Sequence, residues 1–238
     1  MEEVLGSIYL IPTTLGETNA LEVLPLSVKK AIENIDFYIV ENEKIARQSI
    51  KKIVPGKSQP DLSFKLINKY TDPLDYPSFL EPCKQGIDVG ILSDAGCPGI
   101  ADPGAVIVQL AHEMNIRVIP LVGPSSILLA MMASGLNGQN FAFNGYLPID
   151  KKDRKQRIKQ LEKLSKEHNQ AQLFIETPYR NNQLLETLAN SLHPQCQLCV
   201  ACDITLATEY IKTMPSESWK KNKVDLHKRP TLFIIQNK

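Results

Sequence analysis

Ser93-Asp94-Ala95-Gly96-Cys97-Pro98-Gly99-Ile100-Ala101-Asp102-Pro103-Gly104 is the stretch that decides the fold. It follows the apolar run 89–92 and precedes a helix expected over 103–114, with Asp102 as its N-cap. Its glycines and prolines build a rigid loop whose backbone can approach a ligand closely. Ligands bind at the carboxyl ends of strands in open α/β sheets, so we expect a binding site here. The alternative, a purely structural turn, needs only about two to six residues.

Short apolar runs alternate with helical patterns on both sides of this loop. The expected strands are 7–11, 37–40, 89–92, 117–121, 172–175, 198–201 and 231–235. The expected helices are 26–34, 44–53, 103–114, 126–134, 154–167 and 181–192. This alternation predicts an α/β fold with a largely parallel sheet. Residues 1–121 and 122–238 are expected to form two α/β domains, the second with a hairpin-like tail, and a ligand cleft is expected between them.

Composition narrows the class of protein. The chain has 238 residues, of which 22 % are charged and 43 % hydrophobic, and this excludes a disordered chain. A net charge of +1 argues against a general nucleic-acid binder. The first three residues are acidic rather than basic, and prolines and glycines interrupt the uncharged stretch 118–149. We therefore expect a soluble, cytoplasmic protein without a membrane span.

Three of the five cysteines follow the spacing C-x2-C-x2-C, at Cys196, Cys199 and Cys202. Such spacing occurs in iron–sulfur sites, but these need a fourth thiolate and a looping backbone. Here the trio lies in a strand pattern, where Cys199 faces away from the other two. We predict three small buried hydrophobic residues and no metal site.

A second loop, Val122-Gly123-Pro124-Ser125-Ser126-Ile127, also joins a strand pattern to a helix pattern. It is similar to a nucleophile elbow but lacks the second glycine of G-x-S-x-G. Ser125 or Ser126 is a natural helix N-cap. Their hydroxyls, together with the amides at the helix start, could also hold a polar ligand, and the two roles are compatible.

Several motifs occur in one order and spacing along most of the chain. They are 93–104, Pro120-Leu-Val-Gly-Pro-Ser-Ser126, Ala133-Ser-Gly-Leu136, Phe143-Asn-Gly-Tyr-Leu-Pro148 and Phe174-Ile-Glu-Thr-Pro-Tyr-Arg180. Together they closely resemble the ribosomal RNA small subunit methyltransferase I family, of the tetrapyrrole methylase superfamily. The resemblance implies two α/β domains, a homodimer, and methyl transfer from S-adenosylmethionine to a cytidine 2′-hydroxyl of RNA.

The resemblance also implies which residues contact S-adenosylmethionine. Pro12 would border it, and the amino-acid and ribose parts would contact the first long loop, at Asp94, Ala95, Gly96 and Pro98. Ser125 and Ser126 would lie near its methionyl end. Ile175 and Pro230, from the second domain, would line the adenine pocket.

The loops expected to face the methyl acceptor depart from the family pattern. The pattern T-P-I-G-N-L-x-D becomes Ile11-Pro-Thr-Thr-Leu-Gly-Glu-Thr18, and E-D-T-R becomes Glu41-Asn-Glu-Lys44. The pattern S-P-H-R becomes Thr177-Pro-Tyr-Arg180. The cofactor loops are therefore kept while the acceptor side has changed.

A sugar hydroxyl is a poor nucleophile at neutral pH, so a general base is expected near it. Glu41 follows the strand 37–40 at a ligand-facing sheet end and is the candidate; the alternative is a solvated acid at a helix start. Lys44 and Arg180 are candidates for positioning a phosphate, with a surface role as the alternative.

A basic helix offers a surface for RNA. Residues 151–167 carry eight Lys or Arg against three Asp or Glu. Ile158, Leu161 and Leu164 share one side of the helix, so the basic side is expected to face outward. A merely solvated helix is the alternative. Two other functions stay open: a small-molecule tetrapyrrole methylase, and a non-catalytic protein that binds the cofactor or RNA.

Overall fold

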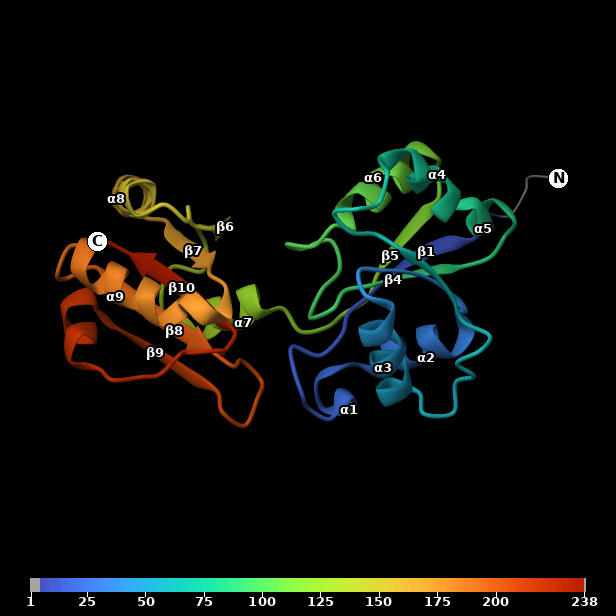
Figure 1. The fold of residues 1–238 in the computed structure, drawn as a ribbon, viewed down its shortest axis with the longest axis horizontal. Helices are drawn as coiled ribbons and strands as arrows, with labels where there is room; N and C mark the ends of the chain where they lie inside the picture. The colour runs from blue at the N-terminus through green and yellow to red at the C-terminus, as the bar shows by residue number, and fades with distance from the viewer. Residues whose placement is uncertain (1–4, 238) are drawn as a thin grey trace. The chain divides into compact units, whose positions relative to one another are not determined.

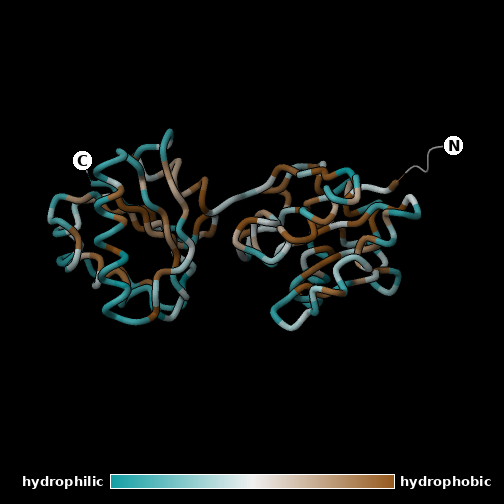
Figure 2. The backbone as a smooth tube through the Cα atoms, turned by 90° about the horizontal axis from the view of Figure 1, so that it is seen from above, coloured by the Kyte–Doolittle hydropathy of each residue, from teal (hydrophilic) through white to brown (hydrophobic). Residues whose placement is uncertain are grey.

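The computed structural model of the chain describes residues 5–237. Contacts divide it into two compact units, the first ending at Ser125 and the second beginning at Ser126 (Figure 1). Each unit has a five-stranded sheet of its own. In Figure 2 the hydrophobic stretches of the backbone gather within each unit. The predicted α/β class is confirmed in both.

The sheet of the first unit is entirely parallel, as predicted. Its strands run in the order β3-β2-β4-β1-β5. They are β1 (Ser7–Ile11), β2 (Phe37–Val40), β3 (Ser63–Leu66), β4 (Val89–Leu92) and β5 (Arg117–Pro120). Strand β3 was not predicted, because it is a largely exposed edge strand without a continuous apolar run.

Helices cover both faces of this sheet (Figure 1). One face carries α1 (Ala20–Val23), α2 (Leu26–Asn34) and α3 (Glu43–Ile53). The other carries the 3₁₀ helix η1 (Pro73–Asp75), α4 (Tyr76–Phe79), α5 (Glu81–Lys84) and α6 (Ala105–Glu113). The alternating residues of each strand feed two separate cores: Tyr38 and Val40 pack on the α2–α3 side, and Ile39 and Ile91 pack on the α6 side.

The start of α6 corrects one prediction. The helix begins at Ala105 with Gly104 at the N-cap position, so Asp102 is not its cap. Asp102 Oδ1 instead accepts hydrogen bonds from the backbone N–H groups of Gly99 at 2.7 Å and of Gly104 at 2.8 Å. Its carboxylate therefore organises the loop that precedes the helix.

The sheet of the second unit is mixed, so the prediction of a largely parallel sheet is wrong for this half. Its order is β6-β7-β10-β8-β9, and only the β6–β7 pair is parallel. The strands are β6 (Phe141–Tyr146), β7 (Ala171–Ile175), β8 (Gln197–Cys202), β9 (Tyr210–Pro215) and β10 (Thr231–Gln236). The short connection from β8 to β9 forms the predicted hairpin, and β10 then enters between β7 and β8 in the antiparallel sense.

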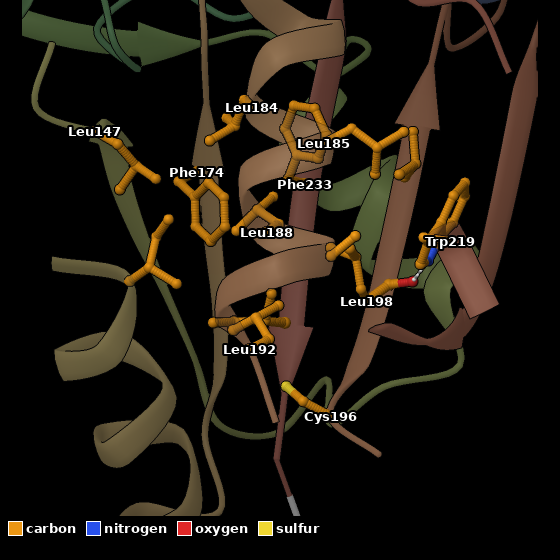
Figure 3. Packing of buried hydrophobic residues seen from close by; sticks show 14 of the residues in the cluster. Leu147, Phe174, Leu184, Leu185, Leu188, Leu192, Cys196, Leu198, Trp219 and Phe233 are labelled. Atoms are coloured by element: carbon orange, nitrogen blue, oxygen red, sulfur yellow. Dashed lines mark hydrogen bonds between the residues drawn. The ribbon is translucent and has the colours of Figure 1, made fainter. Parts of the chain in front are cut away.

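The core of the second unit lies between this sheet and two helices (Figure 3). Helices α8 (Lys151–His168) and α9 (Asn181–Ser191) share that core, and α7 (Ser126–Ser134) contacts β8, β9 and β10. Phe174 and Phe233 stack with ring centroids 6.2 Å apart, beside Leu188 of α9. The indole N–H of Trp219 donates to the Leu198 carbonyl oxygen at 2.9 Å. Two 3₁₀ helices, η2 (Pro178–Arg180) and η3 (Ser216–Lys221), complete the unit.

The cysteine trio lies on β8 and its approach. Cys196 and Cys202 belong to the core under α9, whereas Cys199 does not, so the predicted alternation is confirmed. All three thiols are buried and free. Burial raises the pKa of Cys196 to about 12, as expected for a thiol that serves as a small hydrophobic group.

The helices of residues 5–237 were also compared with the dimensions of a bilayer. Within that range, none is long and apolar enough to cross a membrane.

Candidate functional site

Three polar loops meet at one edge of the parallel sheet. Leu92, the last residue of β4, lies opposite Ile11 at the end of β1 and opposite Val40 at the end of β2. The next residues along each strand are therefore neighbours: the loops that begin at Pro12, Glu41 and Ser93 share the carboxyl edge of the sheet.

Strands β1 and β4 are adjacent, but their connections leave on opposite faces. The chain after β1 enters α1 and α2, and the chain after β4 enters α6 on the other side (Figure 1). Such a switch point opens a crevice at the carboxyl ends of the strands, where ligands bind in open α/β sheets. The structure therefore supports the predicted position of a binding site.

Thr13 ties the two loops across this crevice. Its backbone N–H donates to the Gly96 carbonyl oxygen at 3.0 Å, and its hydroxyl donates to the Ser93 carbonyl oxygen at 3.1 Å. The side chain is 2 % exposed. Both bonds are made in a buried position, so they hold the two loops in one arrangement.

The third loop, after β5, packs directly against the first. A Cβ placed on Gly123 would lie 2.3 Å from the Cβ and Cγ of Pro12, a distance that no side chain can occupy. The Cys97 thiol donates to the Pro124 carbonyl oxygen at 3.3 Å. Gly96 has φ +78°, which favours glycine. Close backbone approach, rather than side-chain contact, thus shapes this edge of the sheet.

Carboxylates are concentrated beside these loops. Burial raises the pKa of Glu41 to about 6, and the negative charges of Asp94 and Asp102 raise it further in the same direction. Burial, and then repulsion from Asp102, also raises the pKa of Asp94. The site is therefore suited to a ligand that brings hydrogen-bond donors or positive charge.

A pocket of about 570 Å³ opens between the loop after β1 and helix α3. Thr14, Leu15 and Gly16 form one wall, and Asp94 and Ala95 reach it from the loop after β4. The α3 side adds Gln48, Ser49, Lys51 and Lys52. The volume is in the range of small-molecule and cofactor sites.

The first unit thus brings several predicted site residues together. Pro12 and the four residues Asp94, Ala95, Gly96 and Pro98 lie in the two loops tied by Thr13. Pro12, Gly96 and Pro98 are buried, whereas Ala95 is exposed. Ser125 ends the first unit, and Ser126 is the first residue of α7 in the second.

Glu41 and Lys44 flank the start of α3. Glu41 is half-buried and Lys44 is exposed on the first turn of the helix. Asn42 is the N-cap between them, and its Oδ1 accepts from the backbone N–H groups of Lys44 at 3.0 Å and Ile45 at 3.2 Å. The cap fixes where the helix starts, and hence where Glu41 leaves β2.

The remaining predicted residues lie in the second unit. Ile175 ends β7 and pairs with Leu232, two residues after Pro230, so Ile175 and Pro230 lie at the same end of the sheet. Arg180 Nη2 donates to Oε1 of Glu176 at 2.6 Å. The Glu176 side chain is fully buried, and the guanidinium of Arg180 is its ionic partner.

Sequence reasoning missed residues that organise the site. Thr13 was read as part of a divergent loop, although a polar residue directly after a buried strand was a usable signal. Asp102 was assigned to the wrong hydrogen bonds. The role of Cys97 and the lysines of α3 in the pocket depends on contacts between segments distant in sequence, which no local pattern reveals.

The chain was compared with known proteins. No family model matches it. It is 30 % identical over 214 residues to ribosomal RNA small subunit methyltransferase I of Bacillus subtilis (strain 168), covering 90 % of this chain and 69 % of that protein. The protein of the same name from Buchnera aphidicola subsp. Schizaphis graminum (strain Sg) is 26 % identical over 235 residues, covering 97 % and 78 %.

Solved structures share the fold. The methyltransferase CobJ has a TM-score of 0.64 at 16 % identity, covering 98 % of this chain and 94 % of that one. Uroporphyrin-III C-methyl transferase from Thermus thermophilus, complexed with S-adenyl homocysteine, has a TM-score of 0.56 at 15 % identity, covering 98 % of both chains. The predicted tetrapyrrole methylase-like fold is confirmed. Sequence and fold agree: the chain belongs to the ribosomal RNA small subunit methyltransferase I family.

Proposed function

We propose that this chain transfers a methyl group from S-adenosylmethionine to a ribose 2′-hydroxyl of small-subunit ribosomal RNA. Membership of a family of methyltransferases supports the class of reaction. The observation that carries the site is the crevice in which Thr13 ties the loops after β1 and β4.

The residues of the crevice fit S-adenosylmethionine. Gly123 and Gly96 leave room for backbone to approach a ligand, and Asp94 reaches the neighbouring pocket with a carboxylate. A carboxylate suits the ribose hydroxyls or the ammonium group of that molecule. We assign Pro12, Asp94, Ala95, Gly96 and Pro98 to its binding.

Residues near the second unit complete the proposed cofactor contacts. Ser125 and Ser126 stand at the start of α7, where hydroxyls and helix-start amides suit the methionyl end. Ile175 and Pro230 share one end of the second sheet and are assigned to the adenine ring. These four assignments rest on the motifs that the chain shares with its family.

Bound S-adenosylmethionine supplies a methyl group on a positively charged sulfur, which becomes neutral when the methyl leaves. The protein must align this methyl with the acceptor oxygen and exclude water. Glu41 is assigned to accept the proton of the hydroxyl. Its pKa of about 6 leaves it ionised at neutral pH, yet closer to the operating pH than an ordinary glutamate.

Lys44 and Arg180 are assigned to positioning RNA phosphate. Lys44 is exposed beside Glu41, which supports the assignment. Arg180 is partly exposed, but it is already bonded to Glu176, so its role includes holding its own loop.

We further propose a cytoplasmic homodimer. Ribosomal RNA, the substrate named for the relatives, supports the location. Apolar side chains exposed on the second unit, Met132, Tyr146 and Ile149, support a second copy as partner. Sedimentation of the full chain gives its oligomeric state directly.

The test measures transfer of labelled methyl from S-adenosylmethionine into small-subunit ribosomal RNA and, separately, into small-molecule extracts. We expect label in the RNA. Label in the extract alone would make the chain a tetrapyrrole or other small-molecule methylase. Cofactor binding without any transfer would make it a non-catalytic binding protein.

The site is tested with Asp94→Asn and the matched Asp61→Asn, which lies on the surface of the same unit. Saturating S-adenosylmethionine, at about 100 times its dissociation constant, stabilises a binding protein by about 2.7 kcal/mol. We expect Asp94→Asn to weaken cofactor affinity about tenfold or more, since a hydrogen bond to a charged group is lost. Equal affinity in both variants would refute the assignment of Asp94.

A further inference from the structure

A second pocket lies in a groove between α8 and α9, away from the crevice of the first unit. It has a volume of about 550 Å³. The first turns of α8 line it with four cationic side chains, Lys151, Lys152, Arg154 and Lys155. Helix α9 contributes polar side chains and a single carboxylate among the lining residues, that of Glu186.

Arg154 is the unusual member of this groove. It is 3 % exposed, although it lies on a helix whose other basic residues are mostly at the surface. Its Nη2 donates to the Ile149 carbonyl oxygen at 2.6 Å. Its Nε and Nη1 are buried without a hydrogen-bond partner in the described part of the chain. A buried guanidinium with unused donors is costly unless an anion completes it.

The acid nearest in sequence does not fill this role. Asp150 caps α8, and its Oδ1 accepts from the backbone N–H groups of Lys152 at 2.8 Å and Asp153 at 3.0 Å. Within residues 5–237 no carboxylate forms an ion pair with Arg154. The groove therefore keeps an excess of positive charge.

The lysines of α8 fall into two groups. Lys159 pairs with Glu162 at 3.2 Å and Lys163 pairs with Glu167 at 3.6 Å, both beyond the groove. Lys151, Lys152 and Lys155, which line it, form no ion pair with any residue in the described range. The charges left without partners are thus concentrated around Arg154.

We propose that the groove between α8 and α9 binds a phosphate group of the RNA backbone, with Arg154 at its base and Lys151 and Lys155 at its rim. The planar fork of arginine matches the oxygens of phosphate, and lysines add mobile positive charge. The start of α8 adds the positive end of an 18-residue helix. This inference rests on the proposed function, because it supplies a contact for the same RNA substrate.

The experiment compares two double variants that lose the same charge from the same helix. Lys151→Gln with Lys155→Gln removes the rim, and Lys159→Gln with Lys163→Gln removes lysines that already have carboxylate partners. Fluorescence anisotropy with a small-subunit ribosomal RNA fragment gives the affinity between about 50 and about 200 mM KCl. For the rim variant we expect weaker binding and a salt slope shallower by about one per lysine. The control should keep the slope of the unaltered chain.

Arg154→Lys adds a test of the fork, since it keeps the charge and loses the planar donors. We expect reduced RNA affinity in a protein that still melts cooperatively. A failure of that variant to fold leaves the rim variant as the deciding measurement. Equal RNA affinity and equal slopes for the rim variant and the control would overturn the proposal.

Two further arms separate other readings. If inorganic phosphate stabilises the unaltered chain but not the rim variant, while RNA binding is the same in both, the groove takes free phosphate and the RNA proposal is overturned. S-adenosylmethionine should raise the melting temperature of the rim variant as it does for the unaltered chain. Methyl transfer to RNA by the unaltered chain, with no effect of the rim substitutions on binding, would refute the groove and leave the proposed function standing.

Discussion

The hydroxyl of Thr13 donates to the Ser93 carbonyl oxygen at 3.1 Å, so one buried side chain joins two loops that lie 80 residues apart in sequence. The backbone N–H of Thr13 bonds to Gly96 in the same loop. The residue thereby fixes the distance between the ends of β1 and β4, where the crevice opens.

Thr13→Val keeps the shape of the side chain and removes this hydroxyl. We expect it to lower the free energy of unfolding by about 1 kcal/mol, because the Ser93 carbonyl loses a buried partner. Affinity for S-adenosylmethionine should fall with it. Urea denaturation and a cofactor titration measure the two effects, and Thr13→Ser should restore both. Unchanged cofactor affinity in the valine variant would separate the hydrogen bond from binding.

Gly123→Ala tests the contact between the first and third loops. The added Cβ would meet Pro12 at 2.3 Å, so one of the two loops must move. We expect a loss of about 1–3 kcal/mol in stability, as for other overpacked sites. Gly56→Ala is the control in the same unit, because a Cβ there has no neighbour within 4 Å. Thermal melts of both variants give the comparison, and equal melting temperatures would contradict the close approach.

Glu41→Gln tests the proposed base. The pKa of about 6 predicts that methyl transfer rises with pH up to about 6 and then levels off, as the carboxylate becomes available. The glutamine variant should transfer slowly at every pH and still bind S-adenosylmethionine. Initial rates from pH 5 to 8 provide the profile. An unaltered profile in the variant would remove Glu41 from the mechanism.

The same substitution has a predicted effect on stability. The folded protein holds the Glu41 proton more tightly than the unfolded chain does, so stability falls as the pH rises from the ordinary pKa of 4.5 to about 6 and then stays level. Glu41→Gln removes this loss and should stabilise the protein at neutral pH by about 1 kcal/mol, after allowance for partial solvent exposure. Urea denaturation at pH 4.5 and pH 7 tests the sign.

Arg180→Gln tests the ion pair with Glu176. The Glu176 side chain is fully buried, so removal of the guanidinium leaves its charge without an ionic partner. We expect a loss of about 2 kcal/mol or more in stability. The double variant Arg180→Gln with Glu176→Gln should recover part of it. If the single variant is as stable as the parent and RNA affinity falls, then Arg180 serves RNA rather than its own loop.

Local patterns predicted the first unit well, because its parallel strands are buried on both faces and appear as continuous apolar runs. Strands β1, β2 and β4 have the bounds that these runs indicate. The second unit was harder. Antiparallel β9 alternates partly buried with exposed residues, and the direction of β10 depends on a partner 30 residues earlier.

The site could be located but not assembled from sequence. The glycine- and proline-rich loop marked the carboxyl edge of the sheet, and the order of motifs marked the family. The tie through Thr13, the bonds of Asp102 and the burial of Arg154 all depend on tertiary contacts. A basic helix pattern places its arginine on the outside by default, and only packing against a neighbouring helix changes that.

The distribution of thiols gives the protein a native position for a reporter group. Four of the five cysteines are buried, and Cys97 alone is half-buried, in the loop whose neighbours are Gly96 and Pro98. Burial raises the pKa of the Cys97 thiol, so a maleimide dye should attach slowly at neutral pH and faster in mild alkali. Without any engineered cysteine, fluorescence from that single label would report when a ligand enters the crevice, and how fast it leaves.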